Sequence, residues 1–475
     1  MITSYFFVTI PALFWSETVT TATKSTHHVS ARVAGIRFLF STHTLQTALD
    51  TVLFDHYRKK LLSGSVVNAS EQRAAWHTEF RNPQPCQLVQ DSLAQIKQIS
   101  DSIRQHQWFF DVKDIVNIGI GGSDLGPKLI CEAFEDEITQ FTLHFVSNLD
   151  KAQIHSTLKK LSPAQTLFIV TSKSFRTTET IENMLIAKQW LLEAGCDPAE
   201  HLIAVTTNIH IATEIYQIPV SRVLMMPDWI GGRFSLWCAV GLPCAIALGF
   251  EKFSELHQGA YEMDMHFLQT SSEKNAPVMY ASLLCDAIMN HSVQALAILP
   301  YAYRLRSLPD YLRQLLMESL GKHVTTMGES VAYPTGPIVY GSAGTNSQHS
   351  FQQLMMQGTH PVFADFILPL TQANMIANCV TQVKTLRDGI ASSDPLKQIP
   401  GGKIANLFVL EKLNLKSVGA LLAFYEHAVV TTAFMLNINP FDQFGVEHAK
   451  CHSESLLKHY GGEIHSIEQI KQILD

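Results

Sequence analysis

The stretch DIVNIGIGGSDLGP, residues 114–127, decides the fold class of this chain. Its first seven residues, 114–120, are largely apolar, which is typical of a buried strand. Gly121 and Gly122 then allow a tight turn and a close approach of the backbone, and the residues after them predict a helix. A buried strand that runs through a glycine turn into a helix indicates an α/β unit.

The same strand, polar loop and helix pattern recurs along the chain. Buried strands are expected at residues 141–147, 166–171 and 201–206, and a second series at 294–299, 337–341 and 362–369. Alternating units of this kind predict parallel sheets with helices on both faces. We therefore expect an α/β fold with two αβα sandwich domains, at residues 106–252 and 255–440.

Two further regions complete the predicted organisation. A chain of 475 residues is too long for one hydrophobic core. Residues 1–105 are interpreted as a helical N-terminal region that packs on the second domain. Residues 441–475 are interpreted as a C-terminal arm that carries Gln443 and Lys450.

The composition argues against several function classes. The net charge of -7 gives no basic footprint for nucleic acid. The eight cysteines form no CxxC pair, and the 21 histidines include no HExxH spacing, so neither a disulfide scaffold nor a metal site is expected. We predict no metal, no cofactor and no nucleic-acid partner.

Two apolar stretches require an interpretation other than a membrane span. Residues 236–250 are too few to cross a bilayer and include Pro243, so a buried core helix is expected. Residues 1–15 are apolar, but no lysine or arginine precedes Lys24, and a secretory signal needs a basic start. A cytoplasmic protein without a membrane partner is the expectation.

The glycine loop at 119–123 is a candidate anion site. A helix that follows such a loop offers free N–H groups and its positive dipole end. A dinucleotide fingerprint is the alternative, because Asp150 could serve as the ribose-binding acid. That fingerprint is incomplete, since Asp124 stands where its third glycine belongs.

The loop SKSFRTTET, residues 172–180, is a second candidate anion site. It follows a predicted strand directly and precedes a helix that begins near Glu179. Hydroxyl and amide groups suit a phosphate monoester that must be released readily. The alternative is an ordinary helix-capping loop, since Ser and Thr favour N-caps. The chain has no GxxxxGK[ST] loop, so a nucleoside triphosphate is not expected.

Seven stretches in one order make the chain resemble the glucose-6-phosphate isomerase family over about residues 40–450. They are IGIGGSDLGP at 118–127, SKSFRTTET at 172–180, DWIGGRFSLW at 228–237, MESLGK at 317–322, GTNSQHSFQQLMMQGT at 344–359, GALLAFYEH at 419–427 and FDQFGVEHAK at 441–450. The resemblance implies two sugar-isomerase (SIS-type) sandwich domains and a sugar-phosphate substrate.

The resemblance also implies roles for individual residues. The implied catalytic residues are Glu318, His349, Lys450, Arg233 and Glu179. The implied substrate-binding residues are Gly122, Ser123, Ser172, Lys173, Ser174, Thr177, Gln314 and Gln443. The chain departs from the family pattern at Ser174, Thr178, Leu320 and Phe444, and at Ser342, Ala343 and Ser347 before His349.

Aldose–ketose isomerisation needs groups of these types. One carboxylate, Glu318, could move a proton between C2 and C1 through a cis-enediol, although an exposed ion pair with Lys322 is the alternative. Arg233 is a permanent cation suited to the developing enediolate, and an ion pair with Asp228 is its alternative.

Ring opening of the sugar needs an acid and a base as well. His349, oriented by Glu179, and Lys450 would supply them according to the resemblance.

The expected function is therefore reversible isomerisation of glucose 6-phosphate and fructose 6-phosphate, in glycolysis and gluconeogenesis. The resemblance further implies a homodimer in which His349 serves the site of the partner. The alternatives are a non-catalytic sugar-phosphate sensor on the same modules, a nucleotide-dependent oxidoreductase, and a related activity on another sugar phosphate.

Overall fold

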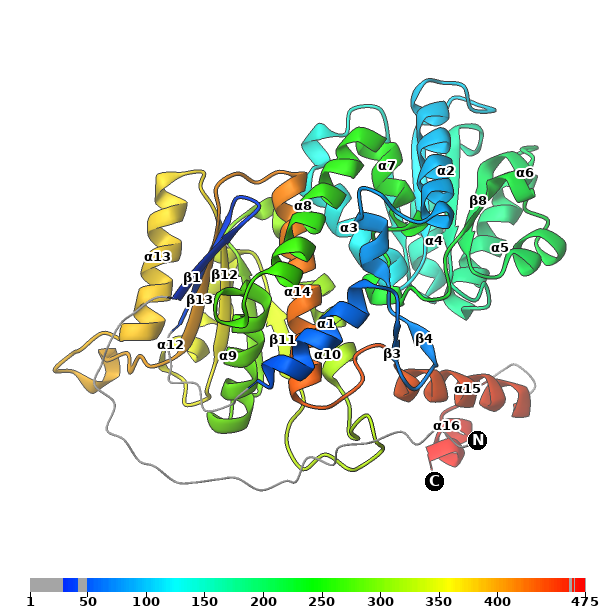
Figure 1. Cartoon of the computed structure of the whole chain (residues 1–475). Coiled ribbons are helices and arrows are strands. Elements are labelled where there is room, and N and C mark those ends of the chain that lie inside the picture. Colours follow the sequence, from blue (N-terminus) through cyan, green and yellow to red (C-terminus); the bar gives the residue numbers. More distant parts are fainter. Residues whose placement is uncertain (1–28, 42–48, 461–463, 465, 475) are drawn as a thin grey trace, which may run out of the picture.

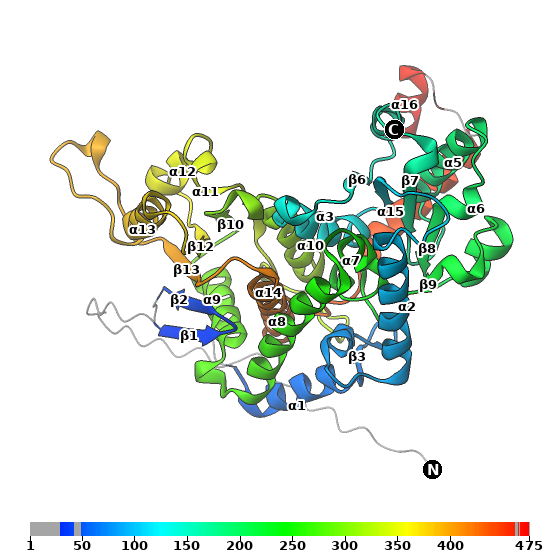
Figure 2. The same cartoon turned by 90° about the horizontal axis from the view of Figure 1, so that it is seen from above.

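The computed structural model describes residues 29–41, 49–460, 464 and 466–474. The apolar start, residues 1–15, lies outside the described residues. Figures 1 and 2 show two α/β units side by side, with the long helices α8 and α14 between the two sheets.

The first unit is built on a five-stranded sheet in the order β6-β5-β7-β8-β9. All its neighbouring strands are parallel. The strands are β5 (Asp114–Ile118), β6 (Thr142–Val146), β7 (Thr166–Thr171), β8 (Leu202–Thr206) and β9 (Val223–Met225). The first four confirm the predicted strands, and the short β9 adds an edge strand that the sequence did not indicate.

Helices cover both faces of the first sheet. Ile115 and Ile169 face the core shared with α2 (Gln87–Arg104), α3 (Gly122–Ala133) and α7 (Leu242–Leu248). Val116 and Phe168 face the opposite core, formed with α4 (Lys151–Leu158) and α5 (Thr178–Glu193). A one-turn helix, α6 (Pro198–His201), precedes β8. This αβα sandwich confirms the predicted fold class of the first unit.

The second unit has a six-stranded sheet in the order β1-β2-β13-β12-β10-β11. Four strands are parallel, namely β10 (Ala295–Pro300), β11 (Ile338–Gly341), β12 (Phe363–Pro369) and β13 (Ile404–Leu410). The hairpin of β1 (Val29–Val33) and β2 (Ile36–Phe40) joins the edge of this sheet antiparallel to β13.

The N-terminal region is therefore not simply helical, and the prediction for residues 1–105 is wrong on this point. Besides β1 and β2 it contains a small hairpin of β3 (Val66–Asn68) and β4 (Arg73–Ala74). Ala34 and Gly35 both have positive φ, which is the backbone of a two-residue hairpin turn. The hairpin is stabilised by the pairing of β2 with β13, a segment far away in the sequence, which a local pattern does not reveal.

Helices also cover both faces of the second sheet. One face packs on α8 (Phe250–Gln269), α9 (Ala276–Asn290), α10 (Leu308–Leu320) and α14 (Leu415–Met435). The other faces α12 (Gln352–Gln357) and α13 (Ala373–Asp388), with the short α11 (Gly344–Gln348) beside Tyr301. The helix α1 (Thr51–Leu62) packs through Phe54 on Phe267 and Phe434.

Two strongly apolar segments lie in the core. α14 is long and apolar enough to cross a membrane by length and composition, yet 89% of that window is buried inside the protein. Phe424 stacks on Phe38 at 4.4 Å and so connects α14 to the sheet. Residues 236–250 form a short 3-10 turn, Ala239–Gly241, and then α7, whose residues are all buried, as expected.

The C-terminal arm contains α15 (Phe444–His459) and α16 (Ile467–Leu474). In Figure 1, α15 lies below the β3–β4 hairpin. The segment just before α15, residues 439–442, is packed into the molecule, because the carboxylate of Asp442 accepts hydrogen bonds from Ser70 and Asn439. This segment brings Gln443 to the body of the protein.

Candidate active site

The two predicted anion loops lie at the same edge of the first sheet. They follow β5 and β7, which are direct neighbours and parallel. The helices that begin after them, α3 and α5, lie on opposite faces of the sheet. This is the point where the strand order reverses, at which open α/β sheets bind their ligands. Both loops can therefore contribute to one site.

Glycines bring the first loop close to two other segments. A Cβ on Gly122 would lie 1.9 Å from the carbonyl oxygen of Gly232, so only glycine fits this contact. Gly121 has φ 61°, and a Cβ there would lie 2.8 Å from Nε2 of Gln314. The loop that holds Ser123 is thus packed against the segment of Arg233 and against α10.

The second loop keeps its hydroxyl groups free of helix capping. Thr177 is the N-cap residue of α5, but its side chain makes no cap hydrogen bond. Instead its Oγ1 accepts from Oγ of Ser172 at 3.0 Å. Ser174 is exposed, and its Oγ accepts from the backbone N–H of Arg176 at 3.3 Å. Buried Phe175 anchors the loop, so the capping interpretation does not account for these hydroxyls.

Lys173 turns its side chain away from the loop. Its Nζ donates to the carbonyl oxygens of Asp228 and Ile230 at 2.7 and 2.8 Å. Burial lowers the pKa of this ammonium to about 8. The side chain therefore fastens the segment that leads to Arg233, and only the backbone of Lys173 is left for the predicted contact with substrate.

Arg233 is buried and surrounded by acceptors from two segments, the end of α10 and residues 440–443. Its Nε donates to Oγ of Ser319 at 2.7 Å, and its Nη1 to Oε1 of Gln443 at 3.1 Å. Its Nη2 donates to the carbonyl oxygens of Pro440 and Asp442. Burial lowers the pKa of the guanidinium, opposed by nearby carboxylates. The ion pair with Asp228 that the sequence left open is not formed.

Glu318 faces Arg233. Its Oε1 lies 3.6 Å from Nη1 of the guanidinium, and 23% of its side chain is exposed. The alternative of an ion pair with Lys322 does not hold, because Nζ of Lys322 donates to the backbone carbonyl of Glu318 instead. Gln314 lies one turn earlier on α10. The structure thus brings Glu318, Arg233, Gln314 and Gln443 together.

Lys450 is less closely associated with this cluster. It is exposed on α15, seven residues after Gln443, and so about 10 Å further along the helix. Gln443 also donates from Nε2 to Glu447 at 2.6 Å, which connects the start of α15 to the cluster.

His349 and Glu318 lie at opposite ends of the second unit's sheet. Arg313 and Met317 contact Val339, which places the end of α10 beside the first residues of β11. His349 follows α11, which packs on Tyr301 beyond the carboxyl end of β10, and it is exposed. One chain therefore does not bring His349 to Glu318. Glu179 is half-buried in the first turn of α5.

Three groups in the cluster were missed by the sequence reasoning. They are the hydroxyl of Ser319, the ammonium of Lys322 and the backbone of Asp442. Ser319 and Lys322 both follow Glu318 in MESLGK, and the sequence analysis considered Lys322 only as an ion-pair partner of the Glu318 carboxylate. Ser319 bonds Arg233, and Lys322 bonds Asp442 as well as the nearby Glu318 carbonyl; the distant partners follow no local pattern.

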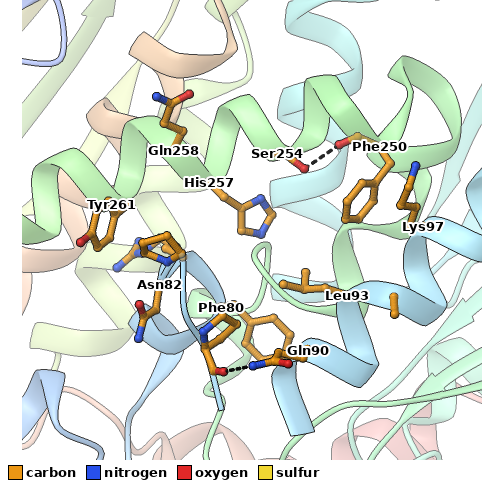
Figure 3. A pocket seen from close by; sticks show the side chains of 14 residues that line it. Phe80, Asn82, Gln90, Leu93, Lys97, Phe250, Ser254, His257, Gln258 and Tyr261 are labelled. Atoms are coloured by element: carbon orange, nitrogen blue, oxygen red, sulfur yellow. Dashed lines mark hydrogen bonds between the residues drawn. The ribbon is translucent and has the colours of Figure 1, made fainter. Parts of the chain in front are cut away.

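A cavity of about 470 Å³ lies elsewhere, between α2, α8 and residues 80–85. Figure 3 shows its wall, in which Phe80, Leu93 and Phe250 supply apolar groups. None of the predicted site residues lines it. In the part of the chain that the structure describes, no three His, Cys, Asp or Glu side chains gather to hold a metal ion.

Comparison with known proteins places this geometry in a family. The family model described as phosphoglucose isomerase matches residues 41–469. A glucose-6-phosphate isomerase from Saccharophagus degradans is 41% identical over 432 residues, which are 82% of this chain and 79% of that protein. One from Alteromonas mediterranea is 39% identical over 451 residues, 86% and 82% of the two chains.

Solved structures agree with the sequence relatives. The crystal structure of a glucose-6-phosphate isomerase from Chlamydia trachomatis superposes with a TM-score of 0.84 at 28% identity, covering 94% of this chain and 92% of that one. A protein from Thermus thermophilus shares the fold, with a TM-score of 0.69 at 23% identity, covering 86% of this chain and 95% of that one. The chain belongs to the phosphoglucose isomerase family.

Proposed function

We propose that this chain catalyses the reversible isomerisation of glucose 6-phosphate and fructose 6-phosphate, in glycolysis and gluconeogenesis. Membership of the phosphoglucose isomerase family makes it an isomerase, and the comparisons give no support to a non-catalytic sensor. The observation that carries the residue assignments is the carboxylate of Glu318 facing the buried guanidinium of Arg233 at 3.6 Å.

The phosphate group binds between the two loops of the first sheet. Ser123, Ser172, Ser174 and Thr177 supply the hydroxyls, and the first turns of α3 and α5 supply backbone N–H groups with positive dipole ends. Hydrogen bonds to a charged phosphate contribute roughly 1.5–3 kcal/mol each. Since Gly121 and Gly122 contact Gln314 and the 232–233 backbone, the bound sugar extends towards the cluster around Glu318.

Glu318 is the base of the isomerisation. Its carboxylate takes the proton from C2 of the open-chain aldose and returns it to C1, which yields the ketose through a cis-enediol. Negative charge develops on the substrate oxygens in this step, and Arg233 lies beside the carboxylate to stabilise it. Because protein acceptors already hold Arg233, little reorganisation is needed. Gln314 and Gln443 bind sugar hydroxyls.

Ring opening is assigned to His349 and Lys450, with Glu179 orienting the histidine. We propose that His349 comes from the partner chain of a homodimer. Two observations support this assignment. His349 is exposed. Glu318 lies about ten residues after the start of α10, and so roughly 15 Å along the helix from the carboxyl end of the sheet, where α10 begins.

Two inactive variants test the shared site. Glu318→Ala and His349→Ala chains are co-expressed with different tags, and the mixed dimers are quantified. If His349 acts in the partner's site, one site of each mixed dimer has both residues. Random pairing makes half of the dimers mixed, so about a quarter of wild-type activity returns. Failure to regain activity in proven mixed dimers, or a monomer at working concentration, rejects the assignment.

The activity itself is tested with a coupled assay for glucose 6-phosphate formed from fructose 6-phosphate. Purified protein is measured with and without a chelator, because the proposed mechanism uses no metal and no cofactor. Equal turnover in both is expected. No turnover in either rejects the function, and loss that zinc or manganese restores rejects the metal-free mechanism. We propose that the protein acts in the cytoplasm, because its relatives are glucose-6-phosphate isomerases.

A further inference from the structure

Lys322 lies just beyond the end of α10, and its ammonium bridges two chain segments. Its Nζ donates to the backbone carbonyl of Glu318 at 2.8 Å and to that of Asp442 at 2.7 Å. The carboxylate oxygen Oδ1 of Asp442 lies 3.4 Å from the same nitrogen. Only 12% of the Lys322 side chain is exposed.

The carbonyl of Glu318 needs a hydrogen-bond donor, and that of Asp442 can accept a second bond beside the one from Arg233. α10 ends at Leu320, so the carbonyl of Glu318 belongs to the last turn, whose carbonyls lack helical donors. The carbonyl of Asp442 lies in a buried turn. Burying a lysine is costly, and burial with the charge of Arg233 lowers the pKa of Lys322. Because burial of the charged ammonium is unfavourable, we infer that its two hydrogen bonds have a role in the structure of the cluster.

The bridge connects the two sides of the cluster. The backbone of Glu318 carries the carboxylate that faces Arg233. The carbonyl of Asp442 also accepts from Nη2 of Arg233 at 3.2 Å. The following residue, Gln443, accepts from Nη1 of the same guanidinium. A displacement of the Asp442 turn relative to α10 would therefore change the separation of Glu318 and Arg233.

We propose that Lys322 is a positioning residue of the isomerisation. It holds the end of α10 against the Asp442 turn, and so it keeps the carboxylate of Glu318 at its distance from Arg233. The inference rests on the proposed roles of these two residues. Lys322 acts through two backbone carbonyls and has no part in proton transfer.

Replacement of Lys322 by methionine tests the proposal, since it keeps most of the length of the side chain and removes the donor. We expect kcat to fall on the order of tenfold to a hundredfold, because a shift of about 1 Å at reacting groups costs up to about a hundredfold. The KM for fructose 6-phosphate should change by less than about threefold, since the phosphate loops keep their own contacts. Lys322→Arg keeps a cationic donor and should regain part of kcat.

Lys403→Met is the matched control. Lys403 also bridges two backbone carbonyls, those of Gly358 and His360, and takes no part in the cluster. This variant should keep wild-type kcat. A fall of kcat in both variants would therefore indicate a general loss of structural rigidity and not a role specific to Lys322. Circular dichroism and thermal melting establish that each protein is folded.

Each result tests either the proposed function or the positioning role of Lys322. An inactive wild-type protein rejects the proposed function, whatever the variants do. With an active wild type, unchanged kcat in Lys322→Met overturns the positioning role, as does a rise of KM alone. Failure of both Lys322 variants to fold also overturns it, because Lys322 is then purely structural. A fall in kcat at constant KM, partly rescued by arginine, supports it.

Discussion

Replacement of Gly122 by alanine should disable the enzyme through a single methyl group. Gly122 lies at the start of α3, where a Cβ would be 1.9 Å from the carbonyl oxygen of Gly232 and 2.9 Å from the backbone nitrogen of Arg233. Alanine keeps the N–H group of residue 122, so phosphate binding through that amide is not removed directly. The substitution therefore isolates the packing of the first loop on the Arg233 segment.

The expected magnitude follows from that distance. Non-bonded atoms in contact lie about 3.5 Å apart or more, so the two backbone segments must separate by more than about 1 Å. A misplacement of this size at a catalytic group lowers kcat/KM on the order of a hundredfold, or about 2.7 kcal/mol of transition-state stabilisation. Overpacking should also reduce the free energy of unfolding by about 1–3 kcal/mol.

The assay compares kcat/KM and thermal melting of Gly122→Ala with those of Gly232→Ala. Gly232 is the other side of the same contact, but a Cβ on it would meet no atom within 4 Å. Its free energy of unfolding should therefore stay within about 0.5 kcal/mol of wild type. A Gly122→Ala protein with wild-type kcat/KM and melting temperature would refute the packing argument.

Three other changes have defined outcomes. Glu318→Gln should lower kcat by a hundredfold or more, on the order expected for loss of a general base. Its affinity for a sugar-acid phosphate, measured by calorimetry, should stay within a few fold of wild type. Retained turnover would mean that another residue is the base. The double substitution Ser172→Ala and Thr177→Ala should raise KM for fructose 6-phosphate by at least about tenfold, since hydrogen bonds to a charged group contribute roughly 1.5–3 kcal/mol each. An unchanged KM would show that the loop serves only to cap the helix. Asp124→Asn should stabilise the protein above pH 6: burial raises the pKa of Asp124 to about 6 from 3.8, and its Oδ1 has no hydrogen-bond partner among the described residues. The folded state thus binds the proton more tightly than the unfolded state, and stability is lost as pH rises from about 4 to 6, by up to about 3 kcal/mol. Melting temperatures at pH 5 and pH 8 check this, and an equal difference between variant and wild type at both values would contradict it.

The sequence by itself determined the α/β class and the positions of the two loops that are proposed to bind phosphate. Both depend on local signals, namely apolar runs of strand length followed by glycines or hydroxyls at the start of a helix. The strands β5 and β7 and the loops after them therefore lie where the pattern predicted. The hairpin of β1 and β2 escaped prediction because its stability comes from pairing with β13, more than 360 residues further along the chain.

Only the tertiary structure decided which partners the charged side chains take. Lys322 seemed able to pair with the carboxylate of Glu318 four residues away, but it donates to a carbonyl of the same residue and to Asp442. Arg233 seemed able to pair with Asp228, but it faces Glu318 and the 440–443 turn. Long flexible side chains can reach many groups, and the packing of distant segments determines which acceptor is buried within reach.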